Sequence, residues 1–305
     1  MVTQILKNLR RTVVIAGATG DLGGRIARAH LRRGFSVHAL VRSDTAEAKV
    51  SAIRADGARP VRVNFDDPAA LQRACADAEC VMSALNGLEP TIVSLQGRLL
   101  DAAVAAGVPR FMPSDFSLDF TKTRPGDNRN MDLRRRFMER IDRSSIRATS
   151  LLNGAFADLL TGEAPIVLHR FNRILYWGDP DQPLDFTTKD DVADYAADLA
   201  MDADAPRFSR IAGDVVSARD LAILITRLSG THYKLFRAGG IRRLGLIINI
   251  ARTLSPKTDA PFPAWQGMQY LRDMSSGRGK LSPLDNGRYG KIDWKRAETV
   301  LAPTI

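Results

Sequence analysis

The sequence has few of the residues that hold metals or form disulfides. Its 305 residues include two cysteines, Cys75 and Cys80, and four histidines that are scattered along the chain. Neither cysteine belongs to the paired Cys/His spacing that zinc sites use. The sequence therefore predicts no metal site and two unreactive thiols in the interior.

Long apolar runs are missing as well. No stretch approaches the roughly 20 apolar residues that span a bilayer, and residues 1–11 lack the apolar core of a secretory signal. We expect no membrane span and a cytoplasmic location. Residues 242–252 are both basic and apolar, which suits a helix on a membrane surface or a lid helix, and we favour the lid.

Acidic residues are the minority, with 34 Asp and Glu against 44 Lys and Arg and a net charge of +10. Clustered basic residues would indicate nucleic-acid binding. The strongest local run is only Arg134, Arg135 and Arg136, and no nucleic-acid motif accompanies it. The excess charge therefore indicates a basic surface that attracts an anionic cofactor, without a nucleic-acid partner.

Apolar runs and helical patterns alternate along the first half of the chain. Strands are expected at 12–16, 35–41, 60–65, 80–85, 110–113 and 147–152, and helices at 22–33, 68–76, 92–106 and 131–142. This alternation is typical of an α/β fold, a Rossmann-type doubly wound parallel sheet.

The remaining chain predicts a second, smaller part. We expect the Rossmann domain to take residues 1–155, with 180–215 returning to it. Residues 156–179 and 216–305 then form a substrate or lid lobe. Within that lobe Ser217 and Asp220 predict a capped helix start, and Gly230 predicts the end of that helix.

A glycine-rich turn lies between the first expected strand and the first expected helix. It consists of Gly17, Ala18, Thr19, Gly20, Asp21, Leu22 and Gly23. Glycines let the backbone turn tightly and approach a pyrophosphate, and the helix N-terminus offers unpaired N–H groups. A tight turn alone would also need glycine, but the surrounding strand and helix favour nucleotide binding.

The end of the second expected strand discriminates between the two nicotinamide cofactors. An acidic residue there would bind the ribose hydroxyls of NAD(H), whereas this sequence has Arg42 followed by Ser43. A guanidinium fork suits a 2′-phosphate, so NADP(H) is favoured over NAD(H). Asp66 is either a partner of the adenine amino group or the cap of the helix that starts at Pro68.

Three segments carry a resemblance to a known family. They are GATGDLG at 17–23, RFMPSDF at 110–116 and LLNGAF at 151–156. Together they resemble the NmrA-like branch of atypical short-chain dehydrogenases, which includes the isoflavone reductase group. The resemblance implies an NADP(H)-binding Rossmann domain with a small C-terminal substrate lobe. It fits both reductases and proteins that bind the dinucleotide without turning it over.

The resemblance also implies further site residues. Those bordering the cofactor would be Ser83, Ala84, Leu85, Asn86, Pro113, Ser114 and Asn153, and those lining the substrate pocket would be Gly154 and Phe156. Each has a structural alternative, because Asn-Gly is a common turn pair and a phenylalanine is often part of a core.

The proton donor departs from the family pattern. The chain has no Tyr-x-x-x-Lys pair, and reductases of the isoflavone group use a lysine four residues before an Arg-Arg pair. That position holds Asn130 here. An asparagine amide cannot donate a proton as an ammonium group does. Lys122, and Asp115 if it is buried, are the other candidates.

Two functions remain open. One is an NADPH-dependent reductase of a small aromatic, quinone-like or carbonyl substrate. The other is a non-catalytic NADP(H) sensor that acts through a protein partner. Asn130 favours the sensor, and the separate lobe favours the reductase.

Overall fold

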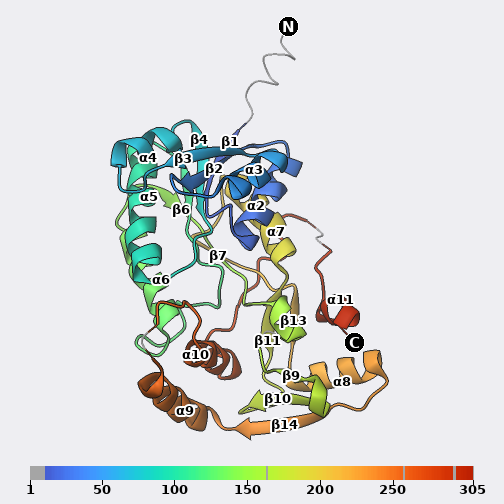
Figure 1. The fold of residues 1–305 in the computed structure, drawn as a ribbon. Helices are drawn as coiled ribbons and strands as arrows, with labels where there is room; N and C mark the ends of the chain where they lie inside the picture. Colours follow the sequence, from blue (N-terminus) through green and yellow to red (C-terminus); the bar gives the residue numbers. More distant parts are fainter. Residues whose placement is uncertain (1–10, 163, 257, 291–292, 305) are drawn as a thin grey trace. The chain divides into compact units, whose positions relative to one another are not determined.

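The structure is a computed structural model that describes residues 11–162, 164–256, 258–290 and 293–304 (Figure 1). The chain divides into two compact units. The first unit comprises residues 1–115, 136–151 and 192–209, and the second comprises 116–135, 152–191 and 210–305. The domain boundaries expected from the sequence stay a prediction.

A six-stranded parallel sheet forms the centre of the first unit. Its strands are β1 (Thr12–Ala16), β2 (Ser36–Arg42), β3 (Arg59–Val63), β4 (Ala78–Ser83), β5 (Arg110–Met112) and β6 (Arg147–Ala148). They lie in the order β3-β2-β1-β4-β5-β6, and all neighbours are parallel. This is the strand order of a doubly wound dinucleotide-binding sheet, so the expected fold class is confirmed.

Helices connect these strands. They are α2 (Asp21–Arg32), α3 (Glu47–Ala55), α4 (Pro68–Cys75), a π-helical turn (Pro90–Leu95) leading into α5 (Gln96–Ala105), and α6 (Arg129–Ile141). A further helix, α7 (Lys189–Met201), follows later in the chain, after the last strand of this sheet. No helix is expected from the sequence at α3. Only Val50 and Ile53 are buried there, and the N-cap residue Ala46 makes no side-chain capping bond. Such a helix carries a weak apolar pattern and no capping signal.

One of the two alternatives for Asp66, the cap of the helix that starts at Pro68, is wrong by one residue. The carboxylate that caps α4 belongs to Asp67, which accepts a hydrogen bond from the Ala70 backbone N–H at 3.0 Å. Asp66 instead lies exposed and forms an ion pair with Arg98 at 3.0 Å. Because Pro68 is the first helical residue, the residue directly before it is the N-cap.

The core of the first unit holds both thiols. Apolar residues of β1, β4 and β5 pack with those of α4, α5 and α6 in one cluster that includes Phe111, Phe137 and Cys75. Cys80 is also fully buried. Burial raises the pKa of both thiols to about 12. The expectation that both cysteines lie in the interior is confirmed, and the raised pKa values favour unreactive thiols.

A histidine is enclosed in the same unit. His30, on α2, has no exposed surface, and its Nδ1 lies 2.8 Å from the carbonyl oxygen of Ile26. Its ring meets Phe35 edge-on, with the ring centres 5.9 Å apart. Burial lowers the pKa of His30 to about 4. The imidazole is therefore neutral in the folded protein at neutral pH.

This histidine should make the fold sensitive to mild acid. The unfolded chain takes up a proton near pH 6.5, whereas folded His30 does so only near pH 4. The free energy of unfolding should therefore fall between these values, by at most about 1.4 kcal/mol per pH unit. Urea unfolding at pH 7 and pH 5 should show a smaller difference for His30→Gln than for the native chain. His232→Gln, at an exposed histidine, is the control, and an equal pH dependence in His30→Gln would contradict the assignment.

The second unit contains two small sheets. One has the order β13-β11-β8, from β13 (Asp214–Val216), β11 (Leu184–Thr187) and β8 (Ala155–Phe156). The other has the order β14-β10-β9, from β14 (Lys234–Gly239), β10 (Arg173–Trp177) and β9 (Val167–Leu168). The strand expected at 147–152 is divided, because β6 pairs with β5 whereas β7 (Ser150–Leu152) pairs with β12 (Phe208–Arg210).

The helices of the second unit lie mostly in the C-terminal third of the chain. They are α8 (Ala218–Ser229), α9 (Ile241–Leu254), α10 (Ala264–Ser275) and α11 (Ala297–Leu301), with short 3₁₀ turns at Ala157–Thr161, His169–Phe171 and Ala302–Thr304. The expected capping box of α8 is confirmed, and this helix ends before Gly230. Within the described residues, no helix has the length and apolar character needed to cross a membrane.

Candidate functional site

The glycine-rich turn joins β1 to α2 in the first unit, as expected. Gly17 has a φ of +94°, and a Cβ atom there would lie 2.6 Å from the carbonyl oxygen of Ala84. A Cβ at Gly23 would lie 2.2 Å from the carbonyl oxygen of Gly17. Backbone thus packs directly on backbone at both positions, which only glycine permits.

The start of α2 is open to a ligand. Its N-cap is Gly20, which has no side chain to accept bonds from the first-turn amides. Thr19, Gly20 and Asp21 are exposed. Free amides at a helix N-terminus, together with the helix dipole, favour an anion such as a pyrophosphate. The turn therefore fits the phosphates of a dinucleotide.

Residues from three strand ends meet beside this turn. The Ala84 backbone N–H donates to the carbonyl oxygen of Ala16 at 2.8 Å. The Ser114 hydroxyl donates to the carbonyl oxygen of Leu85 at 2.6 Å. The order of β1, β4 and β5 in the sheet explains this meeting, because the carboxyl ends of parallel strands share one edge.

The other residues expected in this group differ in exposure. Ser83 and Pro113 are buried, and Asn86 is exposed. The Ser83 hydroxyl has no hydrogen-bond partner among the described residues. Gln96, which the sequence analysis did not identify, is buried and accepts the Ser114 backbone N–H at 2.9 Å. This glutamine positions Ser114 from α5, a contact that no local sequence pattern indicates.

Arg42 stands at the end of β2 with 74% of its side chain exposed. Its nearest charged partner is Asp44, at 3.4 Å. Ser43 is exposed too, and its carbonyl oxygen accepts a bond from Arg62 at 2.8 Å. Arg62 also pairs with Glu47 at 2.7 Å. Arg62, which no local sequence pattern indicates, thus holds the loop after β2 in place.

A cavity of about 240 Å³ lies next to the glycine turn. It is lined by residues 18–21 and by Gly24, Arg28, Lys49, Ala52, Ile53 and Asp56. Arg28 pairs with Asp56 at 2.9 Å. Lys49 makes no ion pair with a carboxylate in the described part of the chain. Lys49 is thus a further cation near the turn, and a single surface lysine gives no signal in the sequence.

Two of the expected pocket residues, Asn153 and Gly154, form the turn between β7 and β8, and Phe156 lies in β8. The backbone N–H groups of Asn153 and Gly154 both donate to the carbonyl oxygen of Ser117, at 3.0 and 3.1 Å. Asn153 is buried, and its Oδ1 has no hydrogen-bond partner among the described residues. Gly154 has a φ of +69°, and Phe156 is half-buried with the Lys189 ammonium 5.9 Å from its ring centre. Their roles stay predictions.

Asn130 lies in the first turn of α6 and is engaged by its neighbours. Its Nδ2 donates to the carbonyl oxygen of Pro261 at 3.0 Å, and its Oδ1 accepts from Arg129 Nε at 3.2 Å. The amide thus fastens the helix start to the segment before α10. A side chain held in this way is better suited to positioning than to proton transfer.

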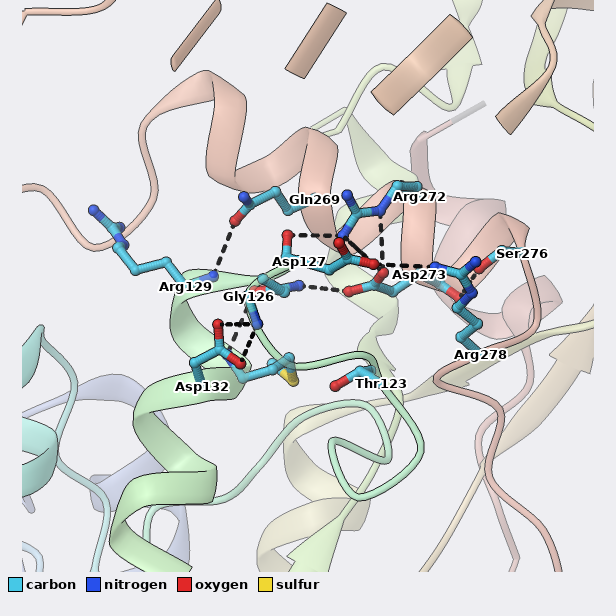
Figure 2. Close-up of polar contacts among 12 residues, drawn as sticks. Thr123, Gly126, Asp127, Arg129, Asp132, Gln269, Arg272, Asp273, Ser276 and Arg278 are labelled. Atoms are coloured by element: carbon cyan, nitrogen blue, oxygen red, sulfur yellow. Dashed lines mark hydrogen bonds and ion pairs between the residues drawn. The ribbon is translucent and has the colours of Figure 1, made fainter. Parts of the chain in front are cut away.

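The loop before α6 is tied to α10 by several polar contacts (Figure 2). Asn128 donates to the buried carboxylate of Asp273 at 2.8 Å, and Arg272 binds the other oxygen of that carboxylate at 3.1 Å. Asp127 accepts from Arg278 at 3.1 Å. Burial raises the pKa of Asp273. These contacts give the surroundings of Asn130 a fixed geometry.

The other two candidate proton donors are also bound. The Lys122 ammonium donates to the carbonyl oxygens of Lys280 and Ser282, at 3.1 and 2.9 Å. Asp115 is fully buried, as its candidacy requires, and its Oδ2 accepts from the Ser150 hydroxyl at 2.7 Å. Both groups therefore already take part in contacts within the protein.

Comparison with known proteins identifies similar sequences. A model of the NmrA-like family matches residues 10–236. Pinoresinol reductase 1 of Arabidopsis thaliana is 29% identical over 199 residues, which cover 61% of this chain and 63% of that protein, less than two thirds of its length. The bifunctional pinoresinol-lariciresinol reductase of Linum usitatissimum is 26% identical over 239 residues, or 72% of this chain and 76% of that protein.

Solved structures share the fold over almost the whole chain. AtPrR2 with NADP+ and (+)pinoresinol has a TM-score of 0.84 at 21% identity, covering 97% of this chain and 99% of the other. The binary complex of leucoanthocyanidin reductase and NADPH from Vitis vinifera has a TM-score of 0.77 at 18% identity, with 96% and 99% coverage. At these identities the similarity establishes the fold alone.

Proposed function

Because the chain belongs to the NmrA-like family, we propose that it is an NADP(H)-dependent reductase of a small aromatic, quinone-like or carbonyl compound. The observation that carries this proposal is the contact between Gly23 and Gly17, which brings the start of α2 against the backbone of the turn. The relatives that are named as reductases, and the NADP+ and NADPH complexes among the similar structures, support it.

The first unit would hold the dinucleotide. In the proposal the open amides of α2 bind the pyrophosphate, and Arg42 and Ser43 bind the 2′-phosphate, with Lys49 as a further cation. Asp66 and the residues at the ends of β4 and β5 border the rest of the cofactor. An exposed arginine at this strand end favours NADP(H) because its positive charge attracts the 2′-phosphate, which an acidic residue would repel.

The protein's part in the reaction is binding and orientation. The reduced nicotinamide supplies a hydride. Asn153, Gly154 and Phe156 are our proposed lining residues. Since the Asn130 amide carries no acidic proton, the best acceptors are quinones and electron-poor carbonyls, which can take up a hydride before water protonates them. A small molecule is the substrate, and the proposal includes a cytoplasmic location and no nucleic-acid partner.

The test is titration with NADPH and NADH, followed by NADPH oxidation with a panel of quinones and aromatic carbonyls. Acceptor-dependent oxidation that falls in Asn153→Ala and Phe156→Ala supports the reductase. Phe171→Ala, at an exposed phenylalanine, is the matched control. Unchanged rates in both pocket variants would remove the pocket assignment.

The second candidate is a non-catalytic NADP(H) sensor that acts through a protein partner. The hydrogen bonds of Asn130 with Pro261 and Arg129 favour this alternative. They show that the residue at the position of the family's lysine holds the helix start in place, a structural role that needs no proton transfer. A sensor would bind NADPH tightly and leave it unoxidised with every acceptor. That result would replace the reductase proposal.

A further inference from the structure

Three arginines of the second unit gather around two aromatic side chains. The guanidinium carbons of Arg129 and Arg252 lie 4.6 and 5.6 Å from the ring centre of Trp265. Arg134 donates to the backbone carbonyl oxygen of Asn130 at 3.1 Å, and Arg129 donates to the side-chain oxygen of the same residue at 3.2 Å. Tyr270 lies on α10 with Trp265. We call the three arginines and the two aromatic residues the arginine–aromatic cluster.

Within the described residues, none of the three arginines forms an ion pair with a carboxylate. Arg129 donates to the carbonyl oxygens of Pro261 and Ala260, at 2.7 and 3.3 Å. Arg134 donates to the carbonyl oxygen of Asn130 at 3.1 Å, and its Nε is buried without a partner in the described part of the chain. Arg252 lies over the Trp265 ring.

The nearby carboxylates are used elsewhere. Asp127 pairs with Arg278, and Asp273 pairs with Arg272. In Figure 2 the Arg129 side chain extends away from both carboxylates, and only its backbone N–H meets Gln269. The local surplus of positive charge is therefore not balanced by these acids.

A surplus of this kind is costly where water is excluded. The Arg134 side chain belongs to a residue that is only 8% exposed. Burial and the nearby charge of Arg252 both lower the pKa of Arg129. Arg129 is half-buried and Arg252 is exposed, so Arg134 is the one guanidinium of the three that is largely removed from water. Two of the positive charges share one ring, and an anion beside them would relieve their mutual repulsion.

The aromatic rings indicate that the ligand also has a flat apolar part. Trp265 is buried, Tyr270 is half-buried, and Phe262, which packs against Tyr270 with ring centres 6.0 Å apart, is 53% exposed. An exposed phenylalanine beside a tyrosine offers a surface for a flat apolar body. Arginine forks bind carboxylate oxygens in pairs.

We propose that the arginine–aromatic cluster binds an aromatic anion, a compound with a ring body and a carboxylate or phenolate group. The anionic group lies among the three guanidinium groups, and the ring packs against Phe262 and Tyr270. Arg129 and Arg134 both donate to Asn130, the position at which the family resemblance places the proton donor. As a statement about the substrate, this inference rests on the proposed reductase function, and it narrows the acceptor to aromatic compounds that carry a negative charge.

The test is calorimetric titration of the full chain with 2-naphthoate and with its neutral isostere 2-naphthamide, with and without NADP+. We expect naphthoate to bind about tenfold tighter than naphthamide, the difference that one charge-assisted contact supplies. Arg252→Gln and Arg129→Gln should each remove most of that difference. Arg242→Gln, at an exposed arginine on the same helix, is the control and should leave it intact.

Three results would overturn the assignment. Equal affinity for the acid and the amide would remove the anion site, and an unaltered preference in both cluster variants would place it elsewhere. Loss of NADPH or inorganic phosphate binding in Arg252→Gln would show that the cluster binds a phosphate group and not an aromatic anion. Failure of the chain to bind NADPH at all would defeat the proposed function, but it would leave the naphthoate measurement unaffected.

Discussion

Gly23→Ala is expected to weaken NADPH binding about a hundredfold, which corresponds to about 2.7 kcal/mol. The added Cβ would lie 2.2 Å from the carbonyl oxygen of Gly17 and 2.7 Å from its carbonyl carbon. Both contacts are with backbone, so no side chain can move aside to relieve them. The turn must shift, and its amides then lose their alignment with the pyrophosphate.

The measurement is a fluorescence titration with NADPH, accompanied by the melting temperature of each variant. Gly245→Ala, in α9, is the control, because nothing lies within 4 Å of its added Cβ. It should stabilise the helix slightly and leave binding unchanged. If Gly23→Ala does not fold, Gly20→Ala replaces it, with a milder contact of 3.4 Å to Gly17. Native affinity in a folded Gly23→Ala protein would refute the proposed phosphate site.

Arg42→Asp is expected to lower the preference for NADPH over NADH about a hundredfold. The change removes a charge-assisted hydrogen bond to the 2′-phosphate and introduces a repulsion, and each contributes about 1.4 kcal/mol, or tenfold. The Arg42 side chain is 74% exposed and its pairing with Asp44 is loose, at 3.4 Å. The replacement should therefore disturb the fold little.

The ratio of the two dissociation constants is the quantity to measure, since it cancels any general loss of affinity. Arg73→Asp, at an exposed position in α4, alters the net charge equally and should keep the native ratio. If Arg42→Asp also kept the native ratio, Arg42 would not be the residue that binds the 2′-phosphate. Lys49, which lines the cavity beside the turn, would become the first alternative.

The sequence was most informative where one local pattern decides the structure. The turn from Gly17 to Gly23 was predicted because strand, glycines and helix follow one another directly. Ser217 and Asp220 formed the expected capping box for the same reason. The capping alternative for Asp66 shows the limit of such reasoning, because two adjacent aspartates are equal candidates until the position of Pro68 in the helix is fixed.

Contacts between distant segments account for most of what was missed. The apolar run at 147–152 reads as one strand, and only the choice between β5 and β12 as partners divides it. Gln96 supports Ser114 from another element. The pattern around the Arg134–Arg135 pair did identify Asn130, but its bond to Pro261, 131 residues further on, has no signature in the sequence.

The buried cysteines give the protein a practical advantage as a subject for thiol labelling. With a pKa of about 12, each thiol is ionised in only about one molecule in ten thousand at pH 8. Maleimides react with thiolates at accessible sites, so Cys75 and Cys80 should stay unmodified while the fold is intact. A single cysteine introduced at an exposed position of the native sequence would therefore take up a fluorescent dye without a cysteine-free background.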